Sequence, residues 1–210
     1  VGKTAVFFSR RKIFTKTQQV IEQFEKYDGP PFDYITFSGT GEPTLADNLG
    51  EVIRRIKSIR REPVCILTNS SLIDRPDVVN DLCEADFVCA KFDAPNPRLF
   101  SQIDDPARGV NFNTIFHGLR AFRKRYKGRL ALQIMFVEDN KRSAKELAKM
   151  AKKIRPNEIQ LNTPLRPSAV APLAESDMIF IENTFREACT QKIAVYNVYR
   201  ARRQKEQASQ

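Results

Sequence analysis

Apolar residues follow two alternating patterns along this chain, short continuous runs and longer stretches with helical spacing. The continuous runs cover residues 34–38, 63–68, 87–93, 130–137 and 158–162. Continuous hydrophobicity over so few residues is typical of strands buried on both faces, as in a parallel sheet. The pattern therefore predicts five strands separated by helices.

Helical periodicity and capping signals predict the segments between the strands. One helix begins behind a cap at Asp47, and its apolar face holds Leu49, Val52, Ile53, Ile56 and Ile59. The longest candidate carries Phe112, Ile115, Phe116, Leu119, Phe122 and Tyr126. Ser143 with Glu146 has the pattern of a capping box before a further helix, and Asp74 with Pro76 opens a short one.

The order of these elements implies parallel strands joined by right-handed crossovers, in either a doubly wound sheet or a barrel. Polar residues such as Ser38, Thr68, Lys91 and Asn162 follow nearly every strand run at its carboxyl end. Polar ends on many strands favour the barrel, because an open sheet gathers its ligand at one switch point. The predicted fold class is α/β, a partial TIM-like barrel of parallel strands that lacks the first strand.

Three segments are expected along the chain: a basic loop over residues 1–15, the partial barrel over residues 16–199 and a polar tail over residues 200–210. The first segment carries no acidic residue and would follow a strand that the chain does not include. The chain begins with Val1 and not with methionine, so further residues are expected before it in the reading frame.

Composition limits the class of protein. With 210 residues, 41% of them hydrophobic, the chain is large enough for one domain with its own core. No apolar run approaches the ~20 residues that cross a bilayer, so neither membrane nor export is indicated and a cytoplasmic location is expected. The net charge of +10 favours phosphate-rich partners or reflects a solvated basic surface.

Several kinds of site are disfavoured by the sequence. Cys65, Cys83, Cys89 and Cys189 form no CxxC or CxxxCxxC spacing and are interpreted as structural thiols. His117, the single histidine, lies in a helical pattern and is interpreted as a packing or surface residue. The chain contains neither a complete phosphate-binding loop nor a GxGxxG or GxSxG motif.

The most informative segment directly follows the first predicted strand and consists of Ser38, Gly39, Thr40, Gly41, Glu42 and Pro43. Glycine admits backbone conformations and close approaches that a Cβ forbids, and proline fixes φ. The segment therefore predicts a fixed pocket in which carbonyl oxygens and a carboxylate face a ligand. Such acceptors suit an ammonium group, which needs oriented oxygen atoms in exchange for its hydration shell.

Five ordered blocks of sequence resemble a known family: DYITFSGTGEPTL, ILTNSSL, ADFVCAKFDAPNPRLFSQID, LQIMFV and IQLNTPLRP. Together they resemble the radical S-adenosylmethionine superfamily, and within it the branch akin to the wyosine tRNA-modifying synthetases. The resemblance implies a partial (β/α)6 barrel that binds S-adenosylmethionine across its strand ends. It also implies a [4Fe-4S] cluster that reductively cleaves this cofactor to a 5'-deoxyadenosyl radical.

The resemblance assigns roles to individual residues. Gly41, Glu42 and Pro43 match the GGEP-type motif that receives the methionine ammonium, although Thr40 replaces a glycine, and Thr68 with Asn69 matches a strand-end pair. The other predicted cofactor contacts are Ser38, Gly39, Asp93, Gln133, Met135, Asn162 and Thr163, and the substrate candidates are Lys91 and Arg166. Asp93 would accept hydrogen bonds from ribose hydroxyls or cap the turn before Pro95. Arg166 would bind a carboxylate or phosphate, or pair with a surface acid.

The CxxxCxxC motif that holds the cluster is absent, and the resemblance places its last cysteine shortly before Val1. The dispersed cysteines of this chain are not expected to converge on a cluster, so the chain alone is expected to be inactive. Its catalytic residues, substrate and product are not specified by the sequence. The resemblance and the charge suggest a tRNA or a protein as substrate, and an electron donor for the cluster as partner.

Two other functions fit part of the pattern. A barrel lyase or aldolase would use Lys91 as a Schiff-base nucleophile, with its pKa lowered at the strand end beside Phe92. A noncatalytic RNA-binding module would use the basic surface, where residues 120–129 include six basic and no acidic residues.

Overall fold

A parallel sheet forms the centre of the computed structural model, which describes residues 10–39, 41–189, 192–201 and 203. Its strands are β1 (Ile35–Phe37), β2 (Val64–Thr68), β3 (Phe87–Lys91), β4 (Arg129–Met135), β5 (Glu158–Asn162) and β6 (Ala194–Asn197). The spatial order of these six strands equals their order in the sequence, and each neighbouring pair is parallel. Since β1 and β6 do not pair with each other, the barrel is open, as the sequence predicts.

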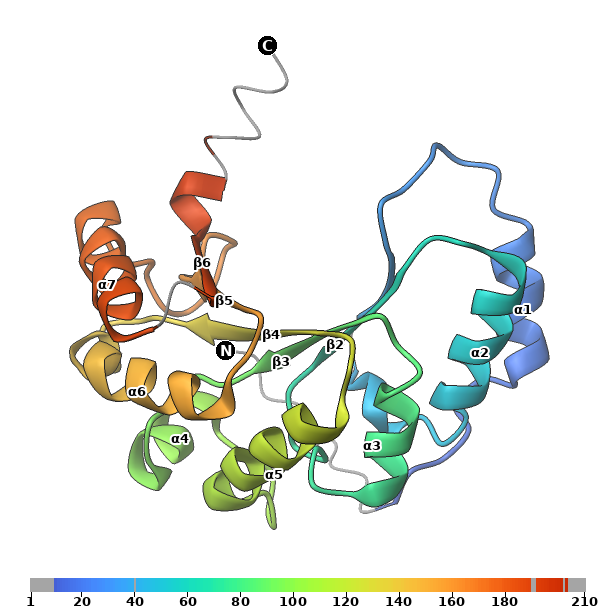
Figure 1. Ribbon diagram of the computed structural model, residues 1–210, viewed down its shortest axis with the longest axis horizontal. Coiled ribbons are helices and arrows are strands. Elements are labelled where there is room, and N and C mark those ends of the chain that lie inside the picture. The colour runs from blue at the N-terminus through green and yellow to red at the C-terminus, as the bar shows by residue number, and fades with distance from the viewer. Residues whose placement is uncertain (1–9, 40, 190–191, 202, 204–210) are drawn as a thin grey trace.

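Helices cover one face of the sheet and connect its strands. They are α1 (Thr17–Glu25), η1 (Pro43–Leu45), α2 (Leu49–Ile59), α3 (Pro76–Leu82), α4 (Pro97–Asp104), α5 (Phe112–Arg125), η2 (Lys141–Ser143), α6 (Ala144–Ile154) and α7 (Glu175–Ala188). In Figure 1, α3 to α6 lie along one side of the sheet, α1 and α2 lie beside the β2 end, and α7 lies at the β6 end. Ile66, Leu132 and Ile159 of the sheet have no exposed surface, nor have Ile53 and Leu147 of the helices.

The sixth strand was not predicted from the sequence. Ala194–Asn197 alternates exposed and buried residues, because β6 is an edge strand with one neighbour and one solvated face. A search for continuous apolar runs cannot find such a strand. The two helices α4 and α7 were likewise not predicted, although Pro97 stands at the first position of α4 and Glu175 and Asp177 lie in the first turn of α7.

Two predicted helix starts are wrong in detail. The helix expected behind Asp47 begins at Leu49 with Asn48 as its N-cap residue, and the Asn48 amide donates to Thr15 O instead of capping the helix. Ser143 stands at the N-cap of α6, but its side chain makes no capping hydrogen bond. Neither side chain therefore accepts a hydrogen bond from the backbone N–H groups at the start of its helix, and the local sequence pattern does not reveal this.

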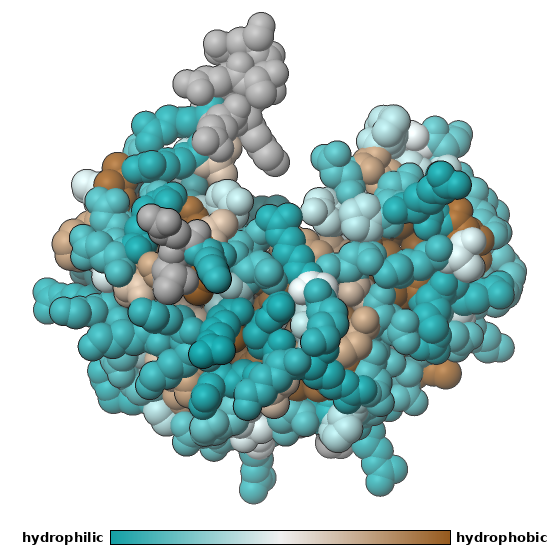
Figure 2. All heavy atoms as spheres, viewed as in Figure 1, coloured by the Kyte–Doolittle hydropathy of each residue, from teal (hydrophilic) through white to brown (hydrophobic). Residues whose placement is uncertain are grey.

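The face of the sheet opposite the helices is concave and partly polar. Strand residues at one register level point to the same side, so Lys91, Gln133, Gln160 and Tyr196 form one row across β3, β4, β5 and β6. Figure 2 shows the surface hollowed between the two ends of the sheet, at the top of the view. This face is where a barrel of this kind can hold a ligand without disturbing its helix-covered core.

The basic segment before α1 contacts the loop that follows β1. Arg11, whose side chain is 3% exposed, donates to Thr44 O at 2.9 Å and Ala46 O at 2.6 Å, and pairs with Asp77 and Asp81 of α3. Lys12 forms an isolated parallel bridge with Ala46. The segment therefore holds the loop in place, whereas residues 1–9 of the predicted basic loop, and most of the predicted tail 200–210, lie outside the described residues.

Replacing Arg11 with methionine is expected to lower the free energy of unfolding by about 2 kcal/mol, because two carbonyls and two partly buried carboxylates lose their donor. Arg11→Lys keeps the charge but cannot supply the planar fork, so an intermediate loss of about 1 kcal/mol is expected. Urea unfolding followed by circular dichroism measures both. Wild-type stability in the lysine variant would show that only the charge matters.

No helix among the described residues combines the length and the apolar character that crossing a bilayer requires.

Candidate active site at the strand ends

Glu42 joins the loop after β1 to the end of β2. Its Oε1 accepts hydrogen bonds from Thr44 N at 3.1 Å, Thr44 Oγ1 at 2.7 Å and Thr68 Oγ1 at 2.7 Å. Its Oε2 accepts one hydrogen bond, from Asn69 N at 2.7 Å. The structure thus brings together Glu42, Thr68 and Asn69, which the sequence placed at two separate strand ends. Oε2 keeps acceptor capacity for a further donor.

Ser70 shapes this strand end and was not among the predicted site residues. It has a left-handed backbone with φ 67° although it is fully buried, a conformation that costs free energy in a residue with a Cβ. Its N–H donates to Thr68 Oγ1 at 3.1 Å and its Oγ donates to Lys91 O at 2.8 Å. Ser70 therefore turns the chain beside Glu42 and ties the end of β2 to that of β3. The polar run NSS after the strand was the available signal.

A groove of about 450 Å³ borders the loop after β1. Its lining includes Ser38, Gly39, Gly41, Glu42 and Pro43 of that loop and the apolar residues Phe14, Val20, Leu49 and Val52. Gly39 has φ 156°, which residues with a Cβ rarely adopt. The predicted fixed backbone pocket thus corresponds to an open groove, while Thr40 lies outside the described residues.

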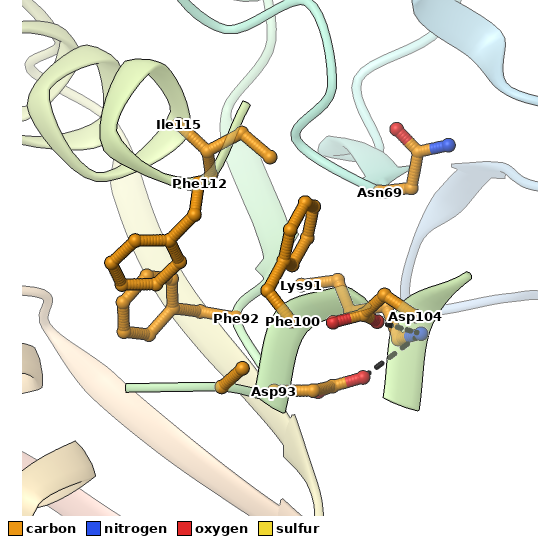
Figure 3. Close-up of a pocket in the computed structure, with 9 residues that line it drawn as sticks. Asn69, Lys91, Phe92, Asp93, Phe100, Asp104, Phe112 and Ile115 are labelled. Atoms are coloured by element: carbon orange, nitrogen blue, oxygen red, sulfur yellow. Dashed lines mark hydrogen bonds and ion pairs between the residues drawn. The ribbon is translucent and has the colours of Figure 1, made fainter. Parts of the chain in front are cut away.

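Lys91, Asp93 and Asp104 form a cluster at the end of β3, shown in Figure 3. Lys91 Nζ lies 2.8 Å from Asp93 Oδ2 and 3.0 Å from Asp104 Oδ1, which comes from the last residue of α4. The Asp93 side chain is completely buried, and its Oδ1 accepts a hydrogen bond from Met135 N at 2.8 Å. Asn69, Phe100 and Phe112 close a cavity of about 20 Å³ around the cluster, enough for one water molecule.

The pKa of Lys91 moves in the direction opposite to that expected for a Schiff-base nucleophile. Burial alone would lower it, but the carboxylates of Asp93 and Asp104 more than offset burial and raise the pKa of Lys91 above its usual value. Lys91 therefore stays an ammonium ion, and the predicted lowered pKa beside Phe92 is wrong. Burial raises the pKa of the Asp93 carboxyl, which Lys91 and the Met135 N–H partly counteract.

Asn140 holds the ends of β3 and β4 together and is a second residue that sequence reasoning missed. It is fully buried, and its Nδ2 donates to Asp93 O and Met135 O, each at 2.9 Å. Its Oδ1 accepts a hydrogen bond from Val137 N at 2.8 Å. Asp93 and Met135, two predicted site residues, are thereby fixed against one another. The Asp93 carboxylate points into this cluster, and its contact with a ribose stays a prediction.

The remaining predicted residues are spread over β4, β5 and the loop after it. Gln133 and Met135 lie on the concave face, and Met135 is in register with Asn162. Thr163 is 3% exposed and its Oγ1 accepts a hydrogen bond from Leu173 N at 2.8 Å, so this hydroxyl supports the loop. Arg166 is exposed. These residues do not line the groove beside Glu42.

The four cysteines are free thiols. Burial is the main cause that raises the pKa of Cys65 to about 11 and that of Cys89 to about 12, so both are protonated at neutral pH. Within the described ranges, no three His, Cys, Asp or Glu side chains are grouped to hold a metal ion. The described residues therefore do not fit an iron–sulfur cluster.

A family model for the Radical SAM superfamily matches residues 5–175 of this sequence. The chain belongs to the radical SAM superfamily. This family uses S-adenosylmethionine and a [4Fe-4S] cluster. The strand-end residues fit the first of these groups, because the Glu42 carboxylate and the backbone of Ser38, Gly39 and Gly41 along the groove offer acceptors for an ammonium ion.

Curated relatives are similar over most of this radical SAM chain. It is 36% identical over 172 residues to a protein of Brachyspira hyodysenteriae named GTPase Obg, a match of 79% of this chain and 25% of that protein. It is 33% identical over 194 residues to a UPF0026 protein of Methanocaldococcus jannaschii, which covers 91% of this chain and 57% of the relative. The chain thus spans between a quarter and about three fifths of such relatives.

Solved structures show the same fold. A radical SAM methyltransferase from Sphaerobacter thermophilus has a TM-score of 0.64 at 17% identity, covering 86% of this chain and 56% of that chain. SuiB of Streptococcus suis bound to S-adenosylmethionine has a TM-score of 0.62 at 12% identity, covering 78% of this chain and 39% of SuiB. The predicted partial barrel of the radical SAM superfamily is confirmed, and the wyosine-like branch stays a prediction.

Proposed function

We propose that this chain is the part of a radical SAM enzyme that binds S-adenosylmethionine at its strand ends and a substrate on its concave face. When bound, S-adenosylmethionine and the reduced cluster, with one electron from an external donor, would supply a 5'-deoxyadenosyl radical for hydrogen abstraction from the substrate. The described residues bind and orient, while cysteines before Val1 hold the cluster.

The observation that carries this proposal is the Glu42 carboxylate, fixed by four donors at the junction of the loop after β1 with the end of β2. A carboxylate held this firmly costs little further entropy when it accepts an ammonium donor. Its Oε2 has one protein donor, and Glu42 lines the groove. Glu42 is therefore assigned to the methionine ammonium, with Thr68 and Asn69 as the residues that orient it.

The substrate is assigned to the concave face because that face is polar and partly open. Gln133 and Gln160 occupy neighbouring strands at one register level, with Lys91 on one side and the 48% exposed Tyr196 on the other. Side-chain amides pair with flat groups that carry both donors and acceptors, such as amides and nucleobases. Both a tRNA and a protein substrate present such groups, and Arg166 at the rim would contact a phosphate or carboxylate.

The test is to express the reading frame extended upstream of Val1 and to reconstitute it anaerobically with iron and sulfide. Visible absorbance of a cluster and release of 5'-deoxyadenosine after reduction, measured by mass spectrometry, are expected. The upstream residues should include CxxxCxxC, and a variant with those cysteines replaced by alanine should release no 5'-deoxyadenosine. An extended chain that assembles a cluster but leaves S-adenosylmethionine unchanged would refute the proposal.

A further inference from the structure

A second surface, away from the carboxyl ends of the strands, carries a concentration of positive charge. A groove of about 620 Å³ between α5 and α6 is lined by six basic side chains, Arg120, Arg123, Lys124, Lys152, Lys153 and Arg155, and by Ile154. All except Arg123 are exposed, and Ile154 is 1% exposed. We refer to these six basic residues as the α5–α6 basic groove. Figure 2 shows that hydrophilic side chains gather on this part of the surface.

The α5–α6 basic groove opens at the edge of the sheet opposite the candidate active site. Arg123 donates to Gly128 O at 3.1 Å and to Asn157 Oδ1 at 3.0 Å, in the loops that lead into β4 and β5. It therefore lies at the amino ends of these strands, whereas Glu42, Thr68 and Asn162 stand at the carboxyl ends of the strands or directly after them. A molecule in this groove would contact the protein without entering the concave face.

The charge of the groove is not neutralised by acidic side chains of the described part of the chain. None of the six basic residues forms an ion pair there, and the acidic residue Glu146 of α6 lies in the first turn, at the other end of that helix. Lys145 and Lys149 extend the positive charge along the exposed side of α6 over a length of roughly 12 Å with Lys153. Six uncompensated cations side by side repel one another and favour binding of a polyanion.

Arg155 provides an independent observation. It follows α6 with a left-handed backbone, φ 61°, at a helix-end position where glycine is the usual residue because it has no Cβ. The Arg155 backbone makes no contribution that glycine could not make, since its N–H donates to Ala151 O in the ordinary helix-end manner. A strained arginine that lines a basic groove is the pattern expected where its guanidinium binds a ligand.

We propose that the α5–α6 basic groove binds the phosphate backbone of a nucleic acid. Phosphate contacts need positive charge and N–H donors but no apolar anchor, and the groove offers only these. The large exposed hydrophobic residues of the described chain, among them Phe14, Tyr34, Phe180 and Tyr196, all lie elsewhere. A surface that inserts into a membrane, or an interface core with an acidic protein, would present such residues.

The probe is a fluorescent single-stranded RNA of about 20 nucleotides, titrated with this chain in fluorescence anisotropy at about 100 mM salt. Lys124→Gln, Lys152→Gln and Lys153→Gln together are expected to weaken binding about tenfold or more and to lower the slope of log K against log salt by about 2. The matched control carries Lys26→Gln, Arg55→Gln and Arg61→Gln, which remove the same charge from other exposed positions. It is expected to bind within about twofold of the wild type.

Arg155→Gly separates binding from folding. Glycine relieves the left-handed backbone, so the thermal midpoint of this variant should equal or exceed that of the wild type while RNA binding weakens about threefold or more. Three results would overturn the proposal: equal losses in the groove and control variants, unchanged RNA binding by Arg155→Gly, or binding to anionic lipid vesicles or an acidic protein in preference to the RNA. A groove that serves only to stabilise helix ends would lower the midpoint of the triple variant and leave RNA binding intact.

Discussion

Glu42→Gln is expected to weaken binding of S-adenosylmethionine about 30-fold, equivalent to about 2 kcal/mol, because a charge-assisted hydrogen bond to an ammonium ion is lost. The amide also cannot accept from all four of the donors that hold the carboxylate, namely Thr44 N, Thr44 Oγ1, Thr68 Oγ1 and Asn69 N. One of its own N–H groups must face another donor. Equilibrium dialysis with labelled S-adenosylmethionine measures the change in affinity.

Glu51→Gln is the matched control for this prediction. Glu51 is an exposed carboxylate in the first turn of α2 and does not line the groove. The substitution Glu51→Gln therefore removes one negative charge without changing the groove lining. Its affinity for S-adenosylmethionine should stay within about twofold of the wild type. If Glu42→Gln and Glu51→Gln bind the cofactor equally well, the ammonium assignment of Glu42 is wrong, whatever happens to the stability of either variant.

Lys91→Met is expected to cost about 3 kcal/mol of folding free energy near neutral pH, since it leaves the completely buried Asp93 carboxylate without its cation. Asp104, whose side chain is 13% exposed, loses the same partner at 3.0 Å. Methionine fills a similar volume, so the loss reports on charge more than on packing. Urea unfolding of the variant and the wild type under the same conditions measures it.

The cost of Lys91→Met should depend on pH. Burial already raises the pKa of Asp93 in the folded protein, and removal of Lys91, which counteracts this, raises it further. The folded state then binds more protons than the unfolded state between the ordinary pKa of an aspartate and this raised pKa, so stability falls as pH rises through that window. The variant should be closest to the wild type at acidic pH and furthest from it above neutrality.

Adding Asp93→Asn to Lys91→Met is expected to recover about half of the lost stability at about pH 8, because the uncompensated charge is removed. The asparagine Oδ1 can still accept from Met135 N. The double variant should also lose the pH dependence of the single one. A single variant that is equally stable at acidic and alkaline pH would show that Asp93 titrates alike in the folded and unfolded states, which would contradict the raised pKa.

The site could be predicted from the sequence where one short segment contains both the strand and its polar end. The motif from Ser38 to Pro43 and the pair Thr68 and Asn69 each directly follow an apolar run, and the structure places Glu42 in hydrogen-bond contact with Thr68 and Asn69. Their roles in cofactor binding stay predictions, but their meeting at one edge follows from parallel strands whose carboxyl ends align. Cys65 and Cys89 were likewise recognised as buried thiols from the apolar runs around them.

The site could not be predicted where a side chain depends on a partner far along the chain. Asp104 pairs with Lys91 because α4, a helix that was not predicted from the sequence, ends beside β3. Asn140 holds Asp93 and Met135 through two carbonyl contacts that no motif announces. The rise in the Lys91 pKa had the opposite sign to the prediction, since the strand-end position alone says nothing about the two carboxylates around the ammonium group.

The parallel α/β architecture, the family and the polar strand ends could be inferred from the order of residues, because hydrophobic periodicity and short motifs are local properties of a chain. The folded arrangement was needed to show that Lys91 remains charged, that Ser70 and Asn140 fix the strand ends, and that basic residues of α5 and α6, more than 25 positions apart, form one groove. The physical reason is that charge, desolvation and hydrogen-bond geometry depend on distance in space, which the folding topology sets.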